Sequence, residues 1–167
     1  TINDYKKIIN KLINVLPNIK FSSDFIIGYP GETYSDFKET LKLMSDIKFI
    51  NSYSFVFNER PGTPAYYLPK VDKDITKDRL KEFQLLAEKI KTEYRKNLID
   101  KISKVLFENK IKNENKYFGR DEHFNSVIVE SKTDLSGKIR DVKISKVNQN
   151  TLYGEINLNL KQRDCAA

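Results

Sequence analysis

Cysteine, histidine and tryptophan are scarce in this sequence of 167 residues, which has one cysteine, one histidine and no tryptophan. The single thiol of Cys165 can close no disulfide within the chain, and an iron–sulfur cluster usually takes three or four thiolates. His123 has no cysteine near it in the sequence, which favours a surface role over metal ligation. Any metal chemistry must therefore come from residues outside this chain.

Long apolar runs are also missing. No stretch approaches the roughly 18 consecutive apolar residues that span a membrane, and the first residues show no signal-peptide pattern. We therefore expect no membrane partner and a cytoplasmic location. The sequence begins at Thr1 and runs directly into a helical pattern, from which we expect a fragment of a longer protein.

Positive charge is in excess, with a formal net charge of +7. Residues 1–100 carry 17 Lys+Arg against 14 Asp+Glu, or +3, and residues 101–167 carry 13 against 9, or +4. The shorter part is thus the more basic. Clustered lysines and arginines attract phosphate, so this balance is compatible with a nucleic-acid partner, although lysine is also simply abundant here.

The first hundred residues alternate between helical and strand patterns. Apolar side chains at three- and four-residue steps predict helices over Tyr5–Leu16, Tyr34–Lys48 and Thr76–Lys101. Between them, Phe21–Tyr29 and Ser52–Phe57 carry short apolar runs, which we interpret as strands buried on both faces. This order is typical of a parallel α/β sheet or barrel.

After Ile102 the apolar period changes from helical to two. Polar and glycine-containing turns separate the candidate strands, which are Ser103–Ile111, Lys116–Asp121, Ser126–Glu130, Lys138–Val147 and Thr151–Leu158. Five short strands in this space predict a small antiparallel barrel of OB type. The fold class is therefore α/β followed by all-β, with a domain boundary near residue 102.

The segment Asp24–Thr33, read as DFIIGYPGET, is the most informative for chemistry. Functional groups of α/β barrels gather where parallel strands end, which places Gly28 at that edge. Glu32 has two interpretations, a ligand contact or a carboxylate favoured by the dipole of the following helix. That helix begins with Thr33 and Asp36, spaced as an N-cap pair.

Two segments together resemble the methylthiotransferase branch of the radical-SAM enzymes. Residues 24–33 resemble their fifth barrel strand, and SFVFNERPGTPA at residues 54–65 resembles the sixth strand and its loop. The resemblance implies contacts to S-adenosylmethionine from Ile26, Gly28, Pro30, Phe57 and Arg60. The guanidinium of Arg60 could bind a carboxylate or phosphate, or it could anchor its own loop.

The resemblance continues through residues 103–160, which look like the small RNA-binding barrel called TRAM. The motifs are Phe118-Gly119-Arg120 and NTLYGE at residues 150–155. It therefore implies the end of a radical-SAM barrel at residues 1–101 and a TRAM domain at residues 102–162. The Gly-Arg followed by Asn125, Val127 and Val129 is closer to the tRNA-modifying branch than to the branch that modifies a ribosomal-protein aspartate.

For the complete enzyme, the resemblance implies addition of a methylthio group to C2 of N6-isopentenyladenosine in tRNA. The expected cofactors are S-adenosylmethionine and two 4Fe-4S clusters, whose cysteines would belong to a missing N-terminal portion of the same enzyme. This chain holds no catalytic residue of its own and is expected to be inactive alone. Two alternatives stay open, a stand-alone RNA-binding module and an enzyme acting on a ribosomal protein.

Basic and aromatic residues of the second half are candidates for RNA contact. The candidate phosphate contacts are Lys104, Arg120, His123, Lys138, Arg140, Lys143 and Lys146. Tyr117, Phe118 and Phe124 are candidates for stacking on unpaired bases. The alternative is that the aromatic side chains fill the barrel core and the lysines are merely solvated.

Overall fold

The computed structural model describes residues 1–156, and the chain divides into two compact units between Lys91 and Thr92. The division lies within the helix α3 (Lys73–Lys96). Among the residues described, no helix is both long and apolar enough to cross a membrane. Cys165 and the ends of the predicted last strand and TRAM domain lie outside the described residues.

The first unit follows the predicted order of helices and strands. Before α3 it contains α1 (Ile2–Val15), β1 (Ser22–Ile27), α2 (Tyr34–Ile47), β2 (Asn51–Val56) and a short 3-10 helix, η1 (Pro64–Tyr67). β1 and β2 pair in parallel, with a register that runs from Ser22 opposite Asn51 to Ile27 opposite Val56. The predicted parallel pairing of these strands is confirmed.

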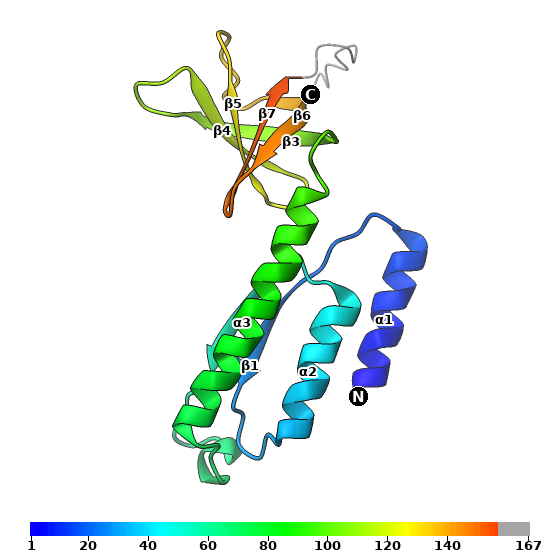
Figure 1. The fold of residues 1–167 in the computed structure, drawn as a ribbon, viewed down its shortest axis with the longest axis vertical. Helices are drawn as coiled ribbons and strands as arrows, with labels where there is room; N and C mark the ends of the chain where they lie inside the picture. Colours follow the sequence, from blue (N-terminus) through cyan, green and yellow to red (C-terminus); the bar gives the residue numbers. More distant parts are fainter. Residues whose placement is uncertain (157–167) are drawn as a thin grey trace. The chain divides into compact units, whose positions relative to one another are not determined.

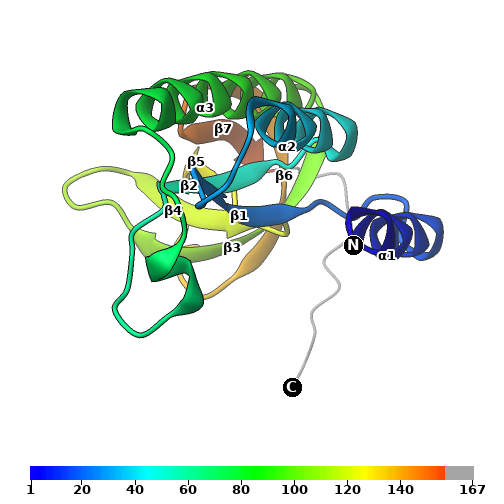
Figure 2. The ribbon, with the colours of Figure 1, turned by 90° about the horizontal axis from the view of Figure 1, so that it is seen from below.

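The helices α2 and α3 lie on the same side of the β1–β2 sheet (Figures 1 and 2). They cover a core to which β1 contributes Phe25 and Ile27, and α3 contributes Phe83 and Ile90. The rings of Phe25 and Phe83 lie 4.7 Å apart. This layer of strands and helices positions the loops that follow β1 and β2.

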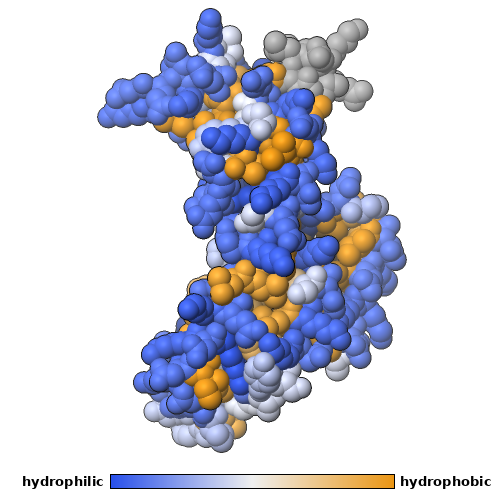
Figure 3. All heavy atoms as spheres, in the orientation of Figure 1, coloured by the Kyte–Doolittle hydropathy of each residue, from blue (hydrophilic) through white to orange (hydrophobic). Residues whose placement is uncertain are grey.

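The prediction that β1 and β2 are buried on both faces is wrong. Side chains alternate between the faces of a strand, and helices cover only one face of this sheet. On the other face Ile26 is 56% exposed and Phe55, its register partner, is 55% exposed. Figure 3 shows the opposite, helix-covered side of this unit, where hydrophobic patches also interrupt a largely hydrophilic exterior.

The start of α2 has the capping arrangement that the sequence predicts. The hydroxyl of Thr33 accepts a hydrogen bond from the Asp36 N–H at 3.2 Å, and the Asp36 carboxylate accepts one from the Thr33 N–H at 2.9 Å. The hydrogen bonds from Thr33 lower the pKa of the Asp36 carboxyl group. The helix ends at Lys48, which has left-handed backbone angles.

The second unit holds a closed barrel of five strands in the order β3-β4-β5-β7-β6. The strands are β3 (Ile102–Lys110), β4 (Lys116–Asp121), β5 (Ser126–Glu130), β6 (Ile139–Val147) and β7 (Thr151–Ile156). β3 pairs with β6 and so closes the ring. Closure and strand number are as predicted, and the barrel is compatible with an OB-like fold.

The prediction of an entirely antiparallel barrel is wrong, because β5 and β7 pair in parallel. The other four pairs are antiparallel. The reason is one of parity. Strand direction cannot alternate all the way round a ring with an odd number of strands, so at least one neighbouring pair must be parallel.

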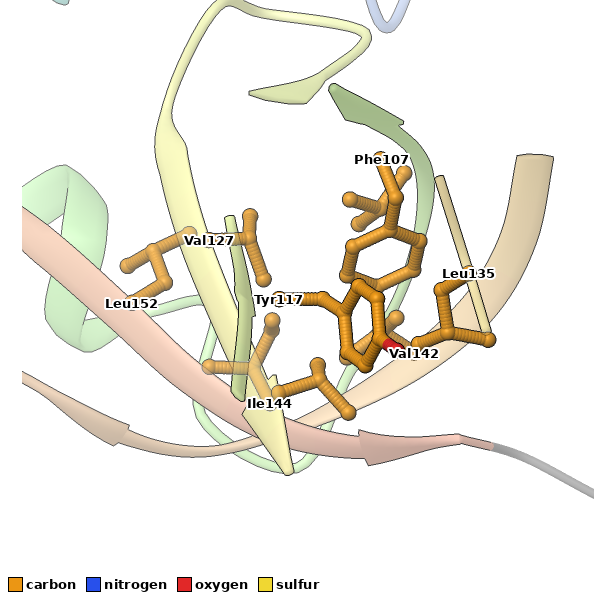
Figure 4. Packing of buried hydrophobic residues seen from close by; sticks show 9 residues of the cluster. Phe107, Tyr117, Val127, Leu135, Val142, Ile144 and Leu152 are labelled. Carbon is orange, nitrogen blue, oxygen red and sulfur yellow. The ribbon is translucent and has the colours of Figure 1, made fainter. Parts of the chain in front are cut away.

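The barrel core consists of alternate residues from every strand and of Leu135 from the loop between β5 and β6. Figure 4 shows the ring of Tyr117 among Phe107, Leu135 and Val142. Tyr117 is only 4% exposed, and Phe107 and Val142 are fully buried. The remaining members of this core are Val105, Val127, Val129, Ile144 and Leu152.

Two strand glycines permit the close backbone approaches of this small barrel. A Cβ atom on Gly119 would lie 2.4 Å from the carbonyl oxygen of Leu106, and one on Gly154 would lie 2.4 Å from that of Lys143. The pairing shifts register next to both glycines, after Phe107 on β3 and after Ile144 on β6. Glycine in a strand often marks such an approach or a bulge.

We predict that Gly119→Ala destabilises the barrel by about 1–3 kcal/mol, because the new methyl group would overlap backbone atoms that cannot move independently. Urea unfolding of the chain, followed by circular dichroism, measures the change. Gln149→Ala, at an exposed turn position, is the control and should cost less than about 0.5 kcal/mol. Equal stability of the two variants would contradict the prediction.

Candidate functional site

The loop after β1 forms a tight turn over Tyr29–Glu32. The N–H of Glu32 donates to the carbonyl oxygen of Tyr29 at 2.8 Å, and Gly31 has φ +84°. A type II turn requires positive φ at its third position, which favours glycine, and proline is common at its second. Pro30 and Gly31 therefore have a local structural purpose.

Gly28 is buried against α3. A Cβ atom there would lie 2.5 Å from the methyl carbon and 2.6 Å from the hydroxyl of Thr76, and the residue has φ +74°. Thr76 is only 4% exposed. Close packing of the loop on this helix thus requires glycine at position 28 whether or not a ligand lies nearby.

A buried ion pair holds the same loop. The guanidinium of Arg79 donates from Nη1 to Oε1 of Glu32 at 2.6 Å and to its carbonyl oxygen at 3.1 Å. Oε2 of Glu32 accepts from the N–H of Gly28 at 3.1 Å. Both charged side chains are 10% exposed. Glu32 therefore ties together the end of β1, the turn and α3, in addition to its favourable place before a helix.

The loops after β1 and β2 meet at one rim. The N–H of Phe57 donates to the carbonyl oxygen of Ile27 at 2.9 Å. The rings of Tyr29 and Phe57 make an edge contact with centroids 5.1 Å apart. The structure thus brings Phe57 beside the turn that follows Gly28.

The predicted cofactor contacts fall into different environments. Ile26 is exposed on the uncovered face, Gly28 and Pro30 are buried, and Phe57 is half-buried. Arg60 is exposed, and its carbonyl oxygen accepts a hydrogen bond from the Thr63 hydroxyl at 2.8 Å. No described residues form a group of three or more His, Cys, Asp or Glu able to hold a metal ion.

Sequence reasoning missed two residues of the uncovered face and the two buried polar residues of α3. Tyr53 and Phe55 share the face of Ile26, and each is more than half exposed. Thr76 and Arg79 precede Phe83 by seven and four residues, so they continue the buried stripe of the helix. That spacing is the signal that would have identified them.

The basic candidates are spread over several strands and loops of the barrel. Lys104, Arg120, Lys138, Lys143 and Lys146 are exposed, whereas His123 and Arg140 are half-buried. Several already have partners. Arg120 pairs with Glu108 at 3.0 Å, and Lys143 pairs with Asp100 at 3.3 Å. The amine of Lys138 donates to the carbonyl oxygen of Asp134 at 2.7 Å, and Arg140 donates to that of Ile139 at 2.8 Å.

The three aromatic candidates separate by burial. Tyr117 belongs to the core, so the structure does not leave it available for stacking. Phe118 is half-buried on the outer surface, with the Arg120 guanidinium 5.5 Å from its ring centroid. Strand register places it beside Ile128, which in turn lies beside Tyr153. Phe124 is 76% exposed.

Comparison with curated proteins finds close relatives over nearly the whole chain, while no family model matches. A protein of Pelagibacter ubique (strain HTCC1062) is 44% identical over 163 residues, which cover 98% of this chain and 36% of the relative. A protein of Nitrosomonas eutropha is 44% identical over 162 residues, covering 93% of this chain and 36% of the relative. Both relatives are named tRNA-2-methylthio-N(6)-dimethylallyladenosine synthase. The chain thus spans about a third of the length of these relatives.

We predict that Arg79→Met destabilises the chain by about 3–5 kcal/mol, because it leaves the Glu32 carboxylate buried without its partner. In the double variant Glu32→Gln/Arg79→Met the buried charge is gone and Gly28 keeps an acceptor, so much of the loss should be recovered. Urea unfolding measures both values.

The control for this pair is Lys38→Met, which breaks the exposed contact of Lys38 with Glu82. Its cost should be below about 1 kcal/mol. A double variant as unstable as Arg79→Met alone would show that an unpaired carboxylate is not the cause.

Proposed function

We infer the function from the family to which this chain belongs, that of the tRNA-2-methylthio-N(6)-dimethylallyladenosine synthases, and propose that it is the C-terminal part of such an enzyme. The complete enzyme would add a methylthio group to C2 of N6-isopentenyladenosine in tRNA. The observation that carries the proposal is identity of 44% over 98% of the chain, which includes both structural units. An enzyme of this kind would work in the cytoplasm, where tRNA is.

The first unit supports the assignment of residues 1–101 to the end of a radical-SAM barrel. Its parallel strands leave an apolar face uncovered, with Ile26 and Phe55 side by side at more than half exposure. A stand-alone RNA-binding module would have no need to expose this face. In a complete enzyme this face would line the interior of the barrel, and the exposed strand edges would be paired.

The uncovered face also fits the purine ring of S-adenosylmethionine. Exposed apolar side chains favour such a ring, and the buried pair of Glu32 and Arg79 holds the loop beside Tyr29 and Phe57. We propose that Ile26, Gly28, Pro30, Phe57 and Arg60 contribute to this site. When bound, S-adenosylmethionine supplies the radical and the methyl group, while this chain positions the cofactor and excludes water.

The residues of this chain do not fit an iron–sulfur cluster. The sequence has a single cysteine, and the described part of the chain contains no group of candidate ligands. We therefore propose that both 4Fe-4S clusters are bound by a portion of the enzyme outside this chain, which is also its partner.

The second unit supports an RNA-binding role as a TRAM domain at residues 102–162. Its closed five-stranded barrel is of a kind that binds oligonucleotides. Its outer surface carries exposed cations, and Phe118 lies under one of them, Arg120. We propose tRNA as the ligand, with phosphate contacts from Lys104, Arg120, His123, Lys138, Arg140 and Lys143.

We predict that deleting the gene for the complete protein removes the 2-methylthio group from tRNA and leaves N6-isopentenyladenosine unmodified at C2. Mass spectrometry of nucleosides from digested tRNA measures both. The complete gene should restore the modification, whereas this chain alone should not, because it lacks ligands for the clusters.

Persistence of the modified nucleoside after deletion would contradict the tRNA assignment. Loss of a methylthio group from a ribosomal-protein aspartate in the same strain would favour the alternative enzyme.

We predict that tRNA binding by this chain weakens steeply with salt, since each neutralised phosphate releases counterions. Arg120→Gln should reduce the slope of log affinity against log salt by about one and weaken binding at low salt. Fluorescence anisotropy with labelled tRNA measures both quantities. Lys42→Gln, an exposed residue of α2, is the control and should leave the slope unchanged. Salt-independent binding would reject the phosphate contacts.

A further inference from the structure

The turn between β4 and β5 presents an aromatic ring in an unusual way. Phe124 is 76% exposed, and its backbone lies in the left-handed region with φ 61°. Among the described non-glycine residues with positive φ, the others are Lys48, Asp100 and Asn113. Asparagine and aspartate tolerate this region, and Lys48 ends a helix. Neither explanation applies to the bulky aromatic residue Phe124. Strained backbone conformations of this kind often occur at functional sites.

Hydrogen bonds from other residues hold the turn in place. Oδ1 of Asp121 accepts from the N–H groups of His123 at 2.9 Å and Asn125 at 2.8 Å, and Oδ2 accepts from the Asn125 side chain at 2.8 Å. Asp121 is 6% exposed and Asn125 is 3% exposed. The backbone N–H of Phe124 also donates to the carbonyl oxygen of Asp121 at 3.0 Å.

The last part of α3 supports the turn from within the same unit. The amide of Asn125 donates to the Tyr94 hydroxyl at 3.4 Å, and the rings of Tyr94 and His123 make an edge contact at 6.3 Å. The Phe124 side chain is a hydrocarbon and takes no part in these hydrogen bonds. Contacts of the neighbouring residues therefore hold the turn in shape, and the Phe124 ring is left exposed to solvent.

The surroundings of the ring are charged rather than apolar. Arg120 directly precedes the turn and is exposed. The backbone N–H of Lys104 donates to the Glu122 carboxylate at 3.3 Å, so this part of β3 passes beside the turn, and Glu122 adds an anion next to the ring. A protein interface would favour a contiguous apolar patch, whereas unpaired nucleotides combine a flat ring with a phosphate. A single exposed ring on a turn with charged neighbours fits the second kind of partner.

We propose that Phe124 is a stacking platform for one unpaired base of RNA, with Lys104 and Arg120 contacting the adjoining phosphates. The inference rests on the proposed RNA-binding role of the barrel and adds the site at which a single-stranded segment is held. Stacking accepts any base, so this contact would fix the position of the strand more than its sequence.

The test compares Phe124→Asn with the unchanged chain. Asparagine tolerates positive φ, so the variant should unfold at the same or a higher urea concentration. Its affinity for a fluorescent single-stranded oligoadenylate of about ten nucleotides, at about 50 mM salt, should fall roughly 5- to 100-fold. The salt slope should not change, because no charge is removed. Phe124→Tyr should bind within about twofold of the unchanged chain, because the ring remains.

The matched control is Ile139→Thr, which removes an apolar side chain that is 55% exposed on the same barrel. It should leave affinity unchanged. Unaltered affinity of Phe124→Asn would overturn the stacking role, while RNA binding by the barrel would stand. A loss of affinity accompanied by lower stability, or by a smaller salt slope, would also overturn it. No binding by the unchanged chain at low salt would overturn both this role and the RNA-binding function.

Discussion

Successive side chains of a strand point to opposite faces, and in β1 and the strands of the barrel only one face meets a core. This alternation determines which candidate residues are buried and which are exposed. Ile27 is fully buried under the helices, while Ile26 is exposed on the other face. In the barrel, Tyr117 fills the core, while Phe118 lies outside beneath Arg120. One step along a strand thus separates a core residue from a candidate binding residue.

The segment GYPGE combines several structural requirements that would look like ligand contacts in the sequence alone. Gly28 leaves room for Thr76, Gly31 completes a turn, and Glu32 is neutralised by Arg79. A buried charge pair costs desolvation free energy, and its hydrogen bonds offset that cost only in a fixed geometry. The rigidity of this rim is therefore a property of packing. The proposed cofactor site uses a loop whose shape is set before any cofactor binds.

In the second unit, closure of the barrel sets the backbone geometry. Five strands in a ring enforce one parallel pair, and Gly119 and Gly154 allow neighbouring backbones to approach at the register shifts. The resulting hairpin between β4 and β5 is held by a buried carboxylate and carries Phe124 at its end. The surrounding hydrogen bonds hold the backbone of this residue at positive φ, and they do not depend on its side chain.

Local patterns in the sequence were sufficient for the order of helices and strands, the parallel pairing of β1 with β2, the N-cap at Thr33 and the five-stranded barrel. These features depend on periodicity and on residues a few positions apart. Only the tertiary structure decided which strand faces are covered, that β5 and β7 run parallel, and that Arg79 reaches Glu32 across 47 residues of sequence. Those outcomes depend on how distant segments pack and on closure of the barrel, and a short segment of sequence reveals neither constraint.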